Sequence, residues 1–191
     1  KTNQADDYSK INIWNRSNYL NIWVVKSIGE SGVAGYAYYP SAVDAPMLAG
    51  IDGIVILHNY VGSIGTSNQN NSRALTHEIG HYFNLQHPWG NNNDPGVACG
   101  DDGVHDTPET KGFVNCPSNP NNAAICNSTI IENYQNFMDY SYCSKMFTKG
   151  QSDRIGAALN SSISNRNNLW IYANLVQTGT DIPNPTSICT P

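Results

Sequence analysis

The chain has 191 residues, enough for a single domain with its own hydrophobic core. Only 13% of the residues are charged, and 26 asparagines supply much of the polar surface, which favours an exterior rich in turns. The net charge of −5 argues against a nucleic acid as the partner. No run reaches the ~18 apolar residues that a membrane span needs, so we predict no membrane span.

The first half of the chain predicts several strands followed by one long helix. Four segments alternate polar and apolar residues, or are rich in β-branched and aromatic ones, and therefore predict strands: residues 10–14, 19–27, 33–39 and 52–58. The last of these contains a continuous apolar run, typical of a strand inside a sheet. A polar loop over residues 62–71 leads to the helix, for which Ser72 is the expected N-cap.

The second half has a different character. Residues 90–136 are dominated by Asn, Gly, Pro, Asp and Cys with little periodicity, which indicates irregular structure held by cross-links. Residues 150–159 predict a helix, and the short apolar segment 169–175 is expected to pack back onto it. We therefore expect one domain over residues 1–191, with an N-terminal subdomain 1–87, a C-terminal subdomain 88–177 and a tail 178–191.

Five cysteines lie at positions 99, 116, 126, 143 and 189, and none forms a C-x-x-C pair, which disfavours a cysteine zinc site or a thioredoxin motif. Cys99, Cys116, Cys126 and Cys143 fall in the irregular part and predict two disulfides, hence an oxidising compartment. Four cysteines allow three connectivities, which local sequence does not separate. Cys189 is left over.

The stretch from His77 to His87 contains the candidate metal-binding residues. On a helix, His77 and His81 are four residues apart and project from one face, with Glu78 beside them. His87 lies six residues past His81 and can join the pair only if the helix ends and the chain turns back. Three neutral nitrogen ligands leave a fourth position open, which is typical of a catalytic zinc site.

The pattern H-E-x-x-H alone is short, and a polar helix face is the alternative interpretation. The third histidine and the apolar neighbours Ile79 and Phe83 favour the zinc site, because the histidines would then face an interior groove. A buried Glu78 is costly unless it has a partner or a role. Zinc would polarise the scissile carbonyl, and Glu78 would take a proton from water and pass it to the leaving amine.

The extended pattern resembles the H-E-x-x-H-x-x-G-x-x-H signature of the metzincin metallopeptidases. Asn136-Phe137-Met138-Asp139-Tyr140 is similar to their methionine turn, and the segments 99–108 and 146–151 are similar to the pappalysin branch. The resemblance covers about residues 19–155. It implies an α+β, metzincin-like zincin fold: a mixed twisted sheet and the active-site helix in the N-terminal lobe, and an irregular, disulfide-linked C-terminal lobe with a C-terminal helix.

The resemblance also implies roles for single residues. His77, His81 and His87 would bind zinc, with Glu78 as general base and acid. Met138 would lie beneath the metal, and Tyr140 would stabilise the oxyanion; without the zinc motif they would be an ordinary core residue and a packed aromatic. The implied disulfides are Cys99–Cys126 and Cys116–Cys143.

A second metal is implied in the acidic loop 101–109, where Asp102, Thr107 and Glu109 are the candidate calcium ligands. The alternative is a solvated turn with capping carboxylates. A melting temperature unmoved by excess calcium after chelation would count against calcium.

Two features depart from the family. Asn84 stands where the signature usually has glycine; asparagine is the other residue that tolerates a positive φ, so we expect the turn to survive. The strand and long helix that the family has ahead of these strands are not seen. We therefore expect the N-terminal subdomain to lack them, with a missing segment or propeptide among the partners. The intact mass of the purified protein would test this.

These observations predict a secreted zinc endopeptidase that acts on protein or peptide substrates. Two alternatives belong to other classes: a catalytically silent zinc-containing binding module, and a zinc hydrolase acting on a non-peptide amide. The intact Glu78 argues against the first, and the methionine turn argues against the second.

Overall fold

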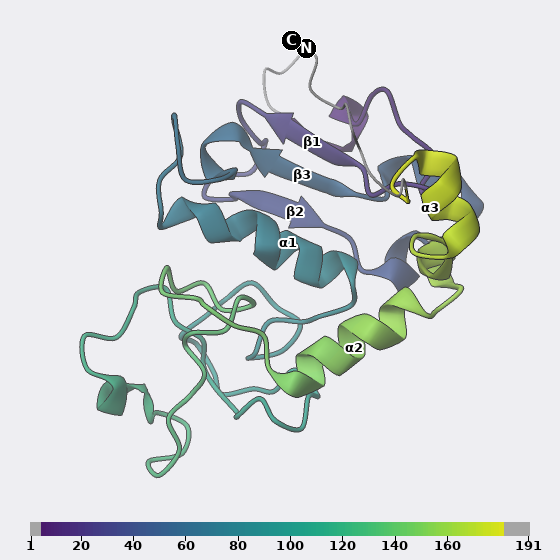
Figure 1. The fold of residues 1–191 in the computed structure, drawn as a ribbon. Coiled ribbons are helices and arrows are strands. Elements are labelled where there is room, and N and C mark those ends of the chain that lie inside the picture. Colours follow the sequence, from purple (N-terminus) through teal and green to yellow (C-terminus); the bar gives the residue numbers. More distant parts are fainter. Residues whose placement is uncertain (1–4, 182–191) are drawn as a thin grey trace.

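The computed structural model describes residues 5–181, which form a mixed sheet with helices and a long irregular segment (Figure 1). Within this range the sheet has the order β1-β3-β2. β1 (Ile22–Val25) runs parallel to β3 (Ile54–Leu57), and β2 (Gly35–Ala37) runs antiparallel to β3. The fold is α+β, as the sequence predicts.

β3 is central because its side chains are apolar on both faces: Ile54, Val55 and Ile56 are fully buried. The predicted strands 19–27, 33–39 and 52–58 each contain one observed strand.

The predicted strand at residues 10–14 is wrong. Asn12 has φ 55°, a left-handed conformation that interrupts an extended chain, and the side chains of Ile11, Ile13 and Trp14 are exposed. The Trp14 N–H donates to the side chain of Asn21 instead of to a strand partner.

α1 (Ala74–Tyr82) packs against β2 and β3, where Ile54, Ile56 and Tyr82 form the core cluster. Ser72 is not its N-cap, contrary to the prediction. A 3-10 turn (Asn71–Arg73) precedes the helix and already accepts the Ala74 N–H at the Asn71 carbonyl, while the Ser72 hydroxyl donates to the Gln69 carbonyl.

The segment between α1 and α2 is irregular, as predicted, with one short 3-10 turn (Pro120–Ala123). The disulfides Cys99–Cys126 and Cys116–Cys143 cross-link it, in the pairing that the family resemblance implies. Figure 1 shows this segment on the side of α1 that faces away from the sheet. It therefore forms a second lobe against the helix.

α2 (Lys149–Leu159) begins with a capping box, in which Thr148 accepts the Gln151 N–H and the Gln151 side chain accepts the Thr148 N–H. α3 (Tyr172–Thr178) covers part of the predicted apolar segment. The indole of Trp170 donates to the Leu159 carbonyl at the end of α2, whereas Leu169 packs against the core cluster of the sheet and α1. Cys189 and the rest of the tail after residue 181 lie outside the described residues.

A buried ion pair connects the C-terminal part to the sheet and to α1. Arg166 and Asp52 are both fully buried and form two hydrogen bonds, of 2.7 and 2.8 Å. The Arg166 guanidinium also stacks on the Tyr82 ring, and its Nε donates to the Tyr82 carbonyl. Because Tyr82 is the last residue of α1, this pair fixes the end of the helix that carries the histidines.

None of the helices between residues 5 and 181 is both long and apolar enough to cross a membrane.

Candidate metal centre

α1 ends in a Schellman motif, which reverses the chain. Asn84 takes the left-handed conformation (φ 70°), as predicted, and its N–H donates to the His81 carbonyl at 2.9 Å. The Leu85 N–H donates back to the Gly80 carbonyl at 2.9 Å. The chain therefore leaves the helix and returns along it.

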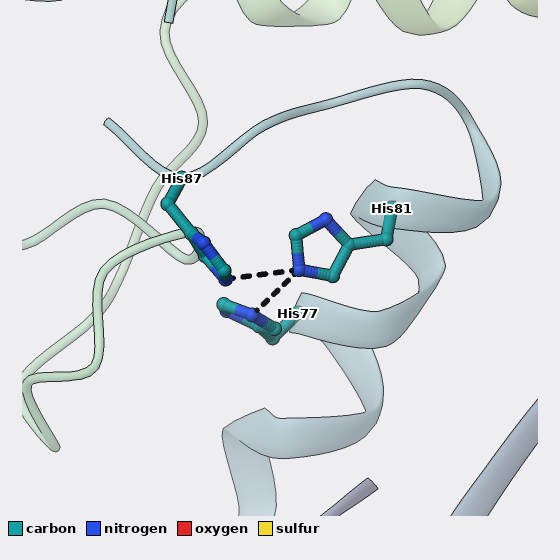
Figure 2. A group of neighbouring side chains, drawn as sticks. All are labelled: His77, His81 and His87. Carbon is teal, nitrogen blue, oxygen red and sulfur yellow. Dashed lines mark hydrogen bonds between the residues drawn. The ribbon is translucent and has the colours of Figure 1, made fainter. Parts of the chain in front are cut away.

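This reversal brings His87 back to the two histidines of α1 (Figure 2). The Nε2 of His81 lies 3.0 Å from the Nε2 of His77 and 3.1 Å from the Nε2 of His87, and all three residues are buried. Two nitrogens bound to one tetrahedral zinc at 2.0–2.1 Å lie about 3.3 Å apart, close to these spacings.

The opposite nitrogen of each ring faces a backbone carbonyl. The Nδ1 atoms of His77, His81 and His87 donate to the carbonyls of Phe137, Leu85 and Asn92, at 2.8, 2.8 and 2.6 Å. Each neutral ring therefore keeps a lone pair on Nε2. Three lone pairs that face one another at this distance repel unless a cation lies among them, so the donor set fits a metal ion such as zinc.

The histidines are held in the neutral form that binds metal. Burial lowers the pKa of His81 to about 4 and the pKa of His87 to about 3. Burial also places the pKa of His77 well below its usual range, and the charges of the other two rings lower it further. Between residues 5 and 181, these three form the only group of at least three His, Cys, Asp or Glu side chains placed to share a metal ion.

Glu78 lies beside this group and is also buried. Its side chain packs against Gly35 of β2, where an added Cβ would lie 3.2 Å from the Glu78 Cγ. Burial raises the pKa of Glu78 to about 8. A carboxyl with such a pKa can both accept and return a proton near neutral pH.

Met138 is fully buried and contacts α1 between its two histidines. A Cβ added to Gly80 would lie 2.3 Å from the Met138 sulfur, so only glycine leaves room for this contact. The turn itself is fixed by Asn136, whose side chain accepts the Met138 N–H and donates to Gln151 of α2.

Tyr140 lies beside two of the histidines. Its ring centroid is 5.4 Å from that of His77 and 4.9 Å from that of His87, and its hydroxyl donates to the Asn93 side chain at 3.3 Å. Burial raises the pKa of Tyr140, and the charge of Glu78 raises it further. The phenol therefore stays protonated and can donate a hydrogen bond at neutral pH.

Sequence reasoning missed two aromatic residues of this centre. Trp89 stacks on His87 with centroids 4.7 Å apart, and Tyr39 meets the edge of His81 at 5.5 Å. For Trp89 a signal was present: a large apolar residue stands two positions after the third histidine. No pattern around Tyr39 links it to a site 38 or more residues away.

The structure does not assemble the three predicted calcium ligands into a shared site. The Asp102 carboxylate accepts the Val104 N–H and the Gln151 side chain, and Glu109 is exposed. The Thr107 hydroxyl is buried and has no hydrogen-bond partner among the described residues. Calcium binding stays a prediction.

Comparison with known proteins identifies the family. Residues 3–160 match the family model for the peptidases described as pregnancy-associated plasma protein-A, the pappalysins. An extracellular metalloprotease of Arthroderma otae is 34% identical over 142 residues, which cover 73% of this chain and 50% of that protein. An extracellular metalloprotease of Sordaria macrospora is 32% identical over 145 residues, covering 74% and 48%. The chain thus spans about half the length of the curated relatives it matches.

A solved structure agrees with this match. Mature mirolysin of Tannerella forsythia in complex with a cleaved peptide superposes with a TM-score of 0.76 at 32% identity, covering 91% of this chain and 67% of mirolysin. The sheet, α1 and the irregular lobe therefore form a metzincin fold. The chain belongs to the pappalysin family of metallopeptidases.

Proposed function

We propose that the chain is a secreted zinc endopeptidase, with His77, His81 and His87 as the zinc ligands. One observation carries this proposal: the buried Nε2 of His81 lies 3.0 Å from the Nε2 of His77 and 3.1 Å from the Nε2 of His87, while the Nδ1 of each ring donates to a backbone carbonyl. Zinc suits three neutral imidazoles better than calcium or magnesium, which prefer oxygen ligands.

When bound, zinc supplies Lewis-acid polarisation of the peptide carbonyl and lowers the pKa of water. Glu78 Oε accepts the proton from the attacking water and returns it to the leaving amine nitrogen. The Tyr140 hydroxyl donates a hydrogen bond to the oxyanion that forms from the carbonyl. Burial of the centre by both lobes strengthens these charge interactions because it excludes bulk water.

The substrate would be a peptide in extended form. β2 is an edge strand of the described sheet and packs against Glu78 through Gly35, so this strand lies next to a reacting group. A peptide that adds to this edge through main-chain hydrogen bonds would present its carbonyl to the centre. The solved mirolysin complex holds a cleaved peptide, which supports the same substrate class here.

Secretion is supported by two observations. The curated relatives are named extracellular metalloproteases, and the irregular lobe depends on two disulfides, which persist in oxidising compartments.

Replacing the general base tests the proposal. Glu78→Ala should retain zinc, because the ligands are untouched, and should lose nearly all peptide hydrolysis, a fall of at least about 10³-fold in kcat. Zinc content and cleavage of a peptide library would be measured together. Glu30→Ala, at an exposed turn, is the matched control. Unchanged cleavage by Glu78→Ala would contradict the assignment.

A further inference from the structure

His87 differs from the other two histidines because no helix holds it. It lies in the chain that returns from α1, where the Gly90 N–H donates to the His87 carbonyl and closes a tight turn. Its ring must nevertheless be placed to within a fraction of an ångström for metal binding. Another group must therefore supply the rigidity that α1 gives to His77 and His81.

Trp89 is placed to supply it. Its indole lies parallel to the His87 ring, with an interplanar angle of 8° and centroids 4.7 Å apart. The indole N–H donates to the Asn92 carbonyl at 3.2 Å, and the same carbonyl accepts the His87 Nδ1–H. It also donates to the Asn92 side chain at 3.1 Å. One acceptor residue thus fixes both stacked rings.

The same indole contacts Tyr140. The two rings meet edge to face, with centroids 5.1 Å apart, while Tyr140 also meets the edge of His87. Trp89 is therefore in contact with a predicted metal ligand and with the predicted oxyanion donor at once. Its one polar group, the indole N–H, already donates to Asn92, so we assign it no chemical role of its own.

The indole cannot retreat from these rings because the irregular lobe packs behind it. A Cβ added to Gly112 would lie 2.1 Å from the Trp89 Cε3, so the backbone of Gly112 abuts the ring. The Gly112 N–H donates to the Thr110 hydroxyl, which donates to the fully buried Glu132. Glu132 in turn accepts the N–H of Cys126 in the Cys99–Cys126 disulfide. A continuous set of contacts runs from the disulfide to the metal ligand.

From these contacts we infer that Trp89 is a positioning residue, which holds His87 for metal binding and Tyr140 for the reaction. The inference rests on the proposed zinc function and adds to it a reason for the cross-linked lobe. The lobe fixes Gly112, Gly112 confines the indole, and the indole confines the two functional rings.

The test uses the full chain with Trp89→Leu, which removes the stacking plane, and Trp89→Phe, which keeps an aromatic ring. Zinc affinity is measured by competition with a chelator. Thermal unfolding of each metal-free variant is recorded first, and the competition is run at a temperature below all of these transitions, where every variant is folded. We expect Trp89→Leu to bind zinc 10- to 100-fold more weakly, in the range for groups that orient a metal ligand, with Trp89→Phe between it and the wild type. Trp170→Leu, at a half-exposed tryptophan of the C-terminal segment, should bind zinc like the wild type.

A second measurement follows Tyr140 and uses Trp89→Phe, the variant that best preserves the core. At saturating zinc, kcat is compared for Tyr140→Phe in the wild-type and Trp89→Phe backgrounds. If Trp89 positions Tyr140, the loss from Tyr140→Phe is several-fold smaller in the Trp89→Phe background. The inference would be overturned, and the proposed function left standing, if both Trp89 variants bound zinc as tightly as the wild type and Tyr140→Phe lowered kcat equally in the two backgrounds. A wild-type chain that binds no zinc would overturn the inference and the proposed function together.

Discussion

At the scale of single residues, the histidines and Met138 of the methionine turn are buried, and their polar groups have hydrogen-bond partners. Each histidine has a carbonyl for its Nδ1–H, and the methionine turn has Asn136 as an acceptor. Asp139, between Met138 and Tyr140, accepts the N–H of Ser141 at 2.8 Å and the N–H of Phe113 at 3.1 Å. Its carboxyl therefore connects the turn to Phe113, in an earlier part of the irregular lobe.

Asp139 should make stability depend on pH. Burial raises its pKa to about 7, against about 3.9 for an unfolded aspartate. Between these values the unfolded chain has released the proton while the folded chain keeps it, so the free energy of unfolding falls as the pH rises. Asp139→Asn cannot titrate and lacks this decrease.

Urea unfolding of the metal-free wild type and Asp139→Asn at pH 5 and pH 7.5 would measure it. Between pH 5 and pH 7.5, the free energy of unfolding of the wild type should fall relative to that of Asp139→Asn by on the order of 2 kcal/mol, since each pKa unit is worth about 1.4 kcal/mol. Other titrating groups occur in both proteins and cancel. Parallel pH dependences would refute the assignment.

At the scale of elements, the site depends on how α1 ends. The helix presents two histidines, its Schellman motif at Asn84 returns the third, and Arg166 holds the last turn through Tyr82. Arg166 comes from the 3-10 segment (Ile163–Asn168) before α3, and Asp52 lies two residues before the start of β3. One ion pair thus connects three elements that lie far apart in the sequence.

Removing Arg166 should destabilise the fold strongly. Arg166→Met leaves the Asp52 carboxylate buried, with Arg16 at 3.7 Å as its remaining ion-pair partner among the described residues, and should lower the free energy of unfolding by about 3–5 kcal/mol. Urea unfolding measures this loss. Lys149→Met removes an exposed ion pair with Asp153 and should leave the free energy nearly unchanged. A similar small effect of both variants would show that the buried pair does not hold the helix end.

Sequence patterns predicted what depends on neighbours along the chain. The apolar run of β3 and the histidine spacing are local features, and the structure has both. The positive φ at Asn84, which the structure also has, was expected from the glycine of the family signature. The strand at residues 10–14 failed because the left-handed Asn12 breaks an alternation that otherwise fits. The cysteine positions alone left three pairings open, and only the family resemblance selected the observed one.

Contacts between distant residues were not predictable from the sequence. Asp52 and Arg166 are 114 residues apart, and nothing in the sequence around either residue identifies its partner. Trp89 stands next to the zinc motif, yet its inferred role depends on Gly112 and on the irregular lobe behind the indole. The sequence of that lobe has no periodic pattern from which these contacts could be predicted.

At the scale of the whole molecule, two lobes of different construction meet at one centre. The N-terminal lobe gains its order from a buried sheet and helix, whereas the second lobe has little regular structure before α2 and relies on disulfides and on buried hydrogen bonds such as those of Glu132. His77 and His81 come from the first lobe, and Phe137, Met138 and Tyr140 come from the second. A metal at this centre would therefore join the lobes and stabilise both.

The zinc stoichiometry of the folded chain tests this account most directly. After dialysis against a weak chelator and addition of excess zinc, elemental analysis of the wild type should give one zinc per chain. The triple variant His77→Ala, His81→Ala, His87→Ala should retain none at this centre. A wild type without zinc, or a triple variant that binds zinc as tightly as the wild type, would contradict the account.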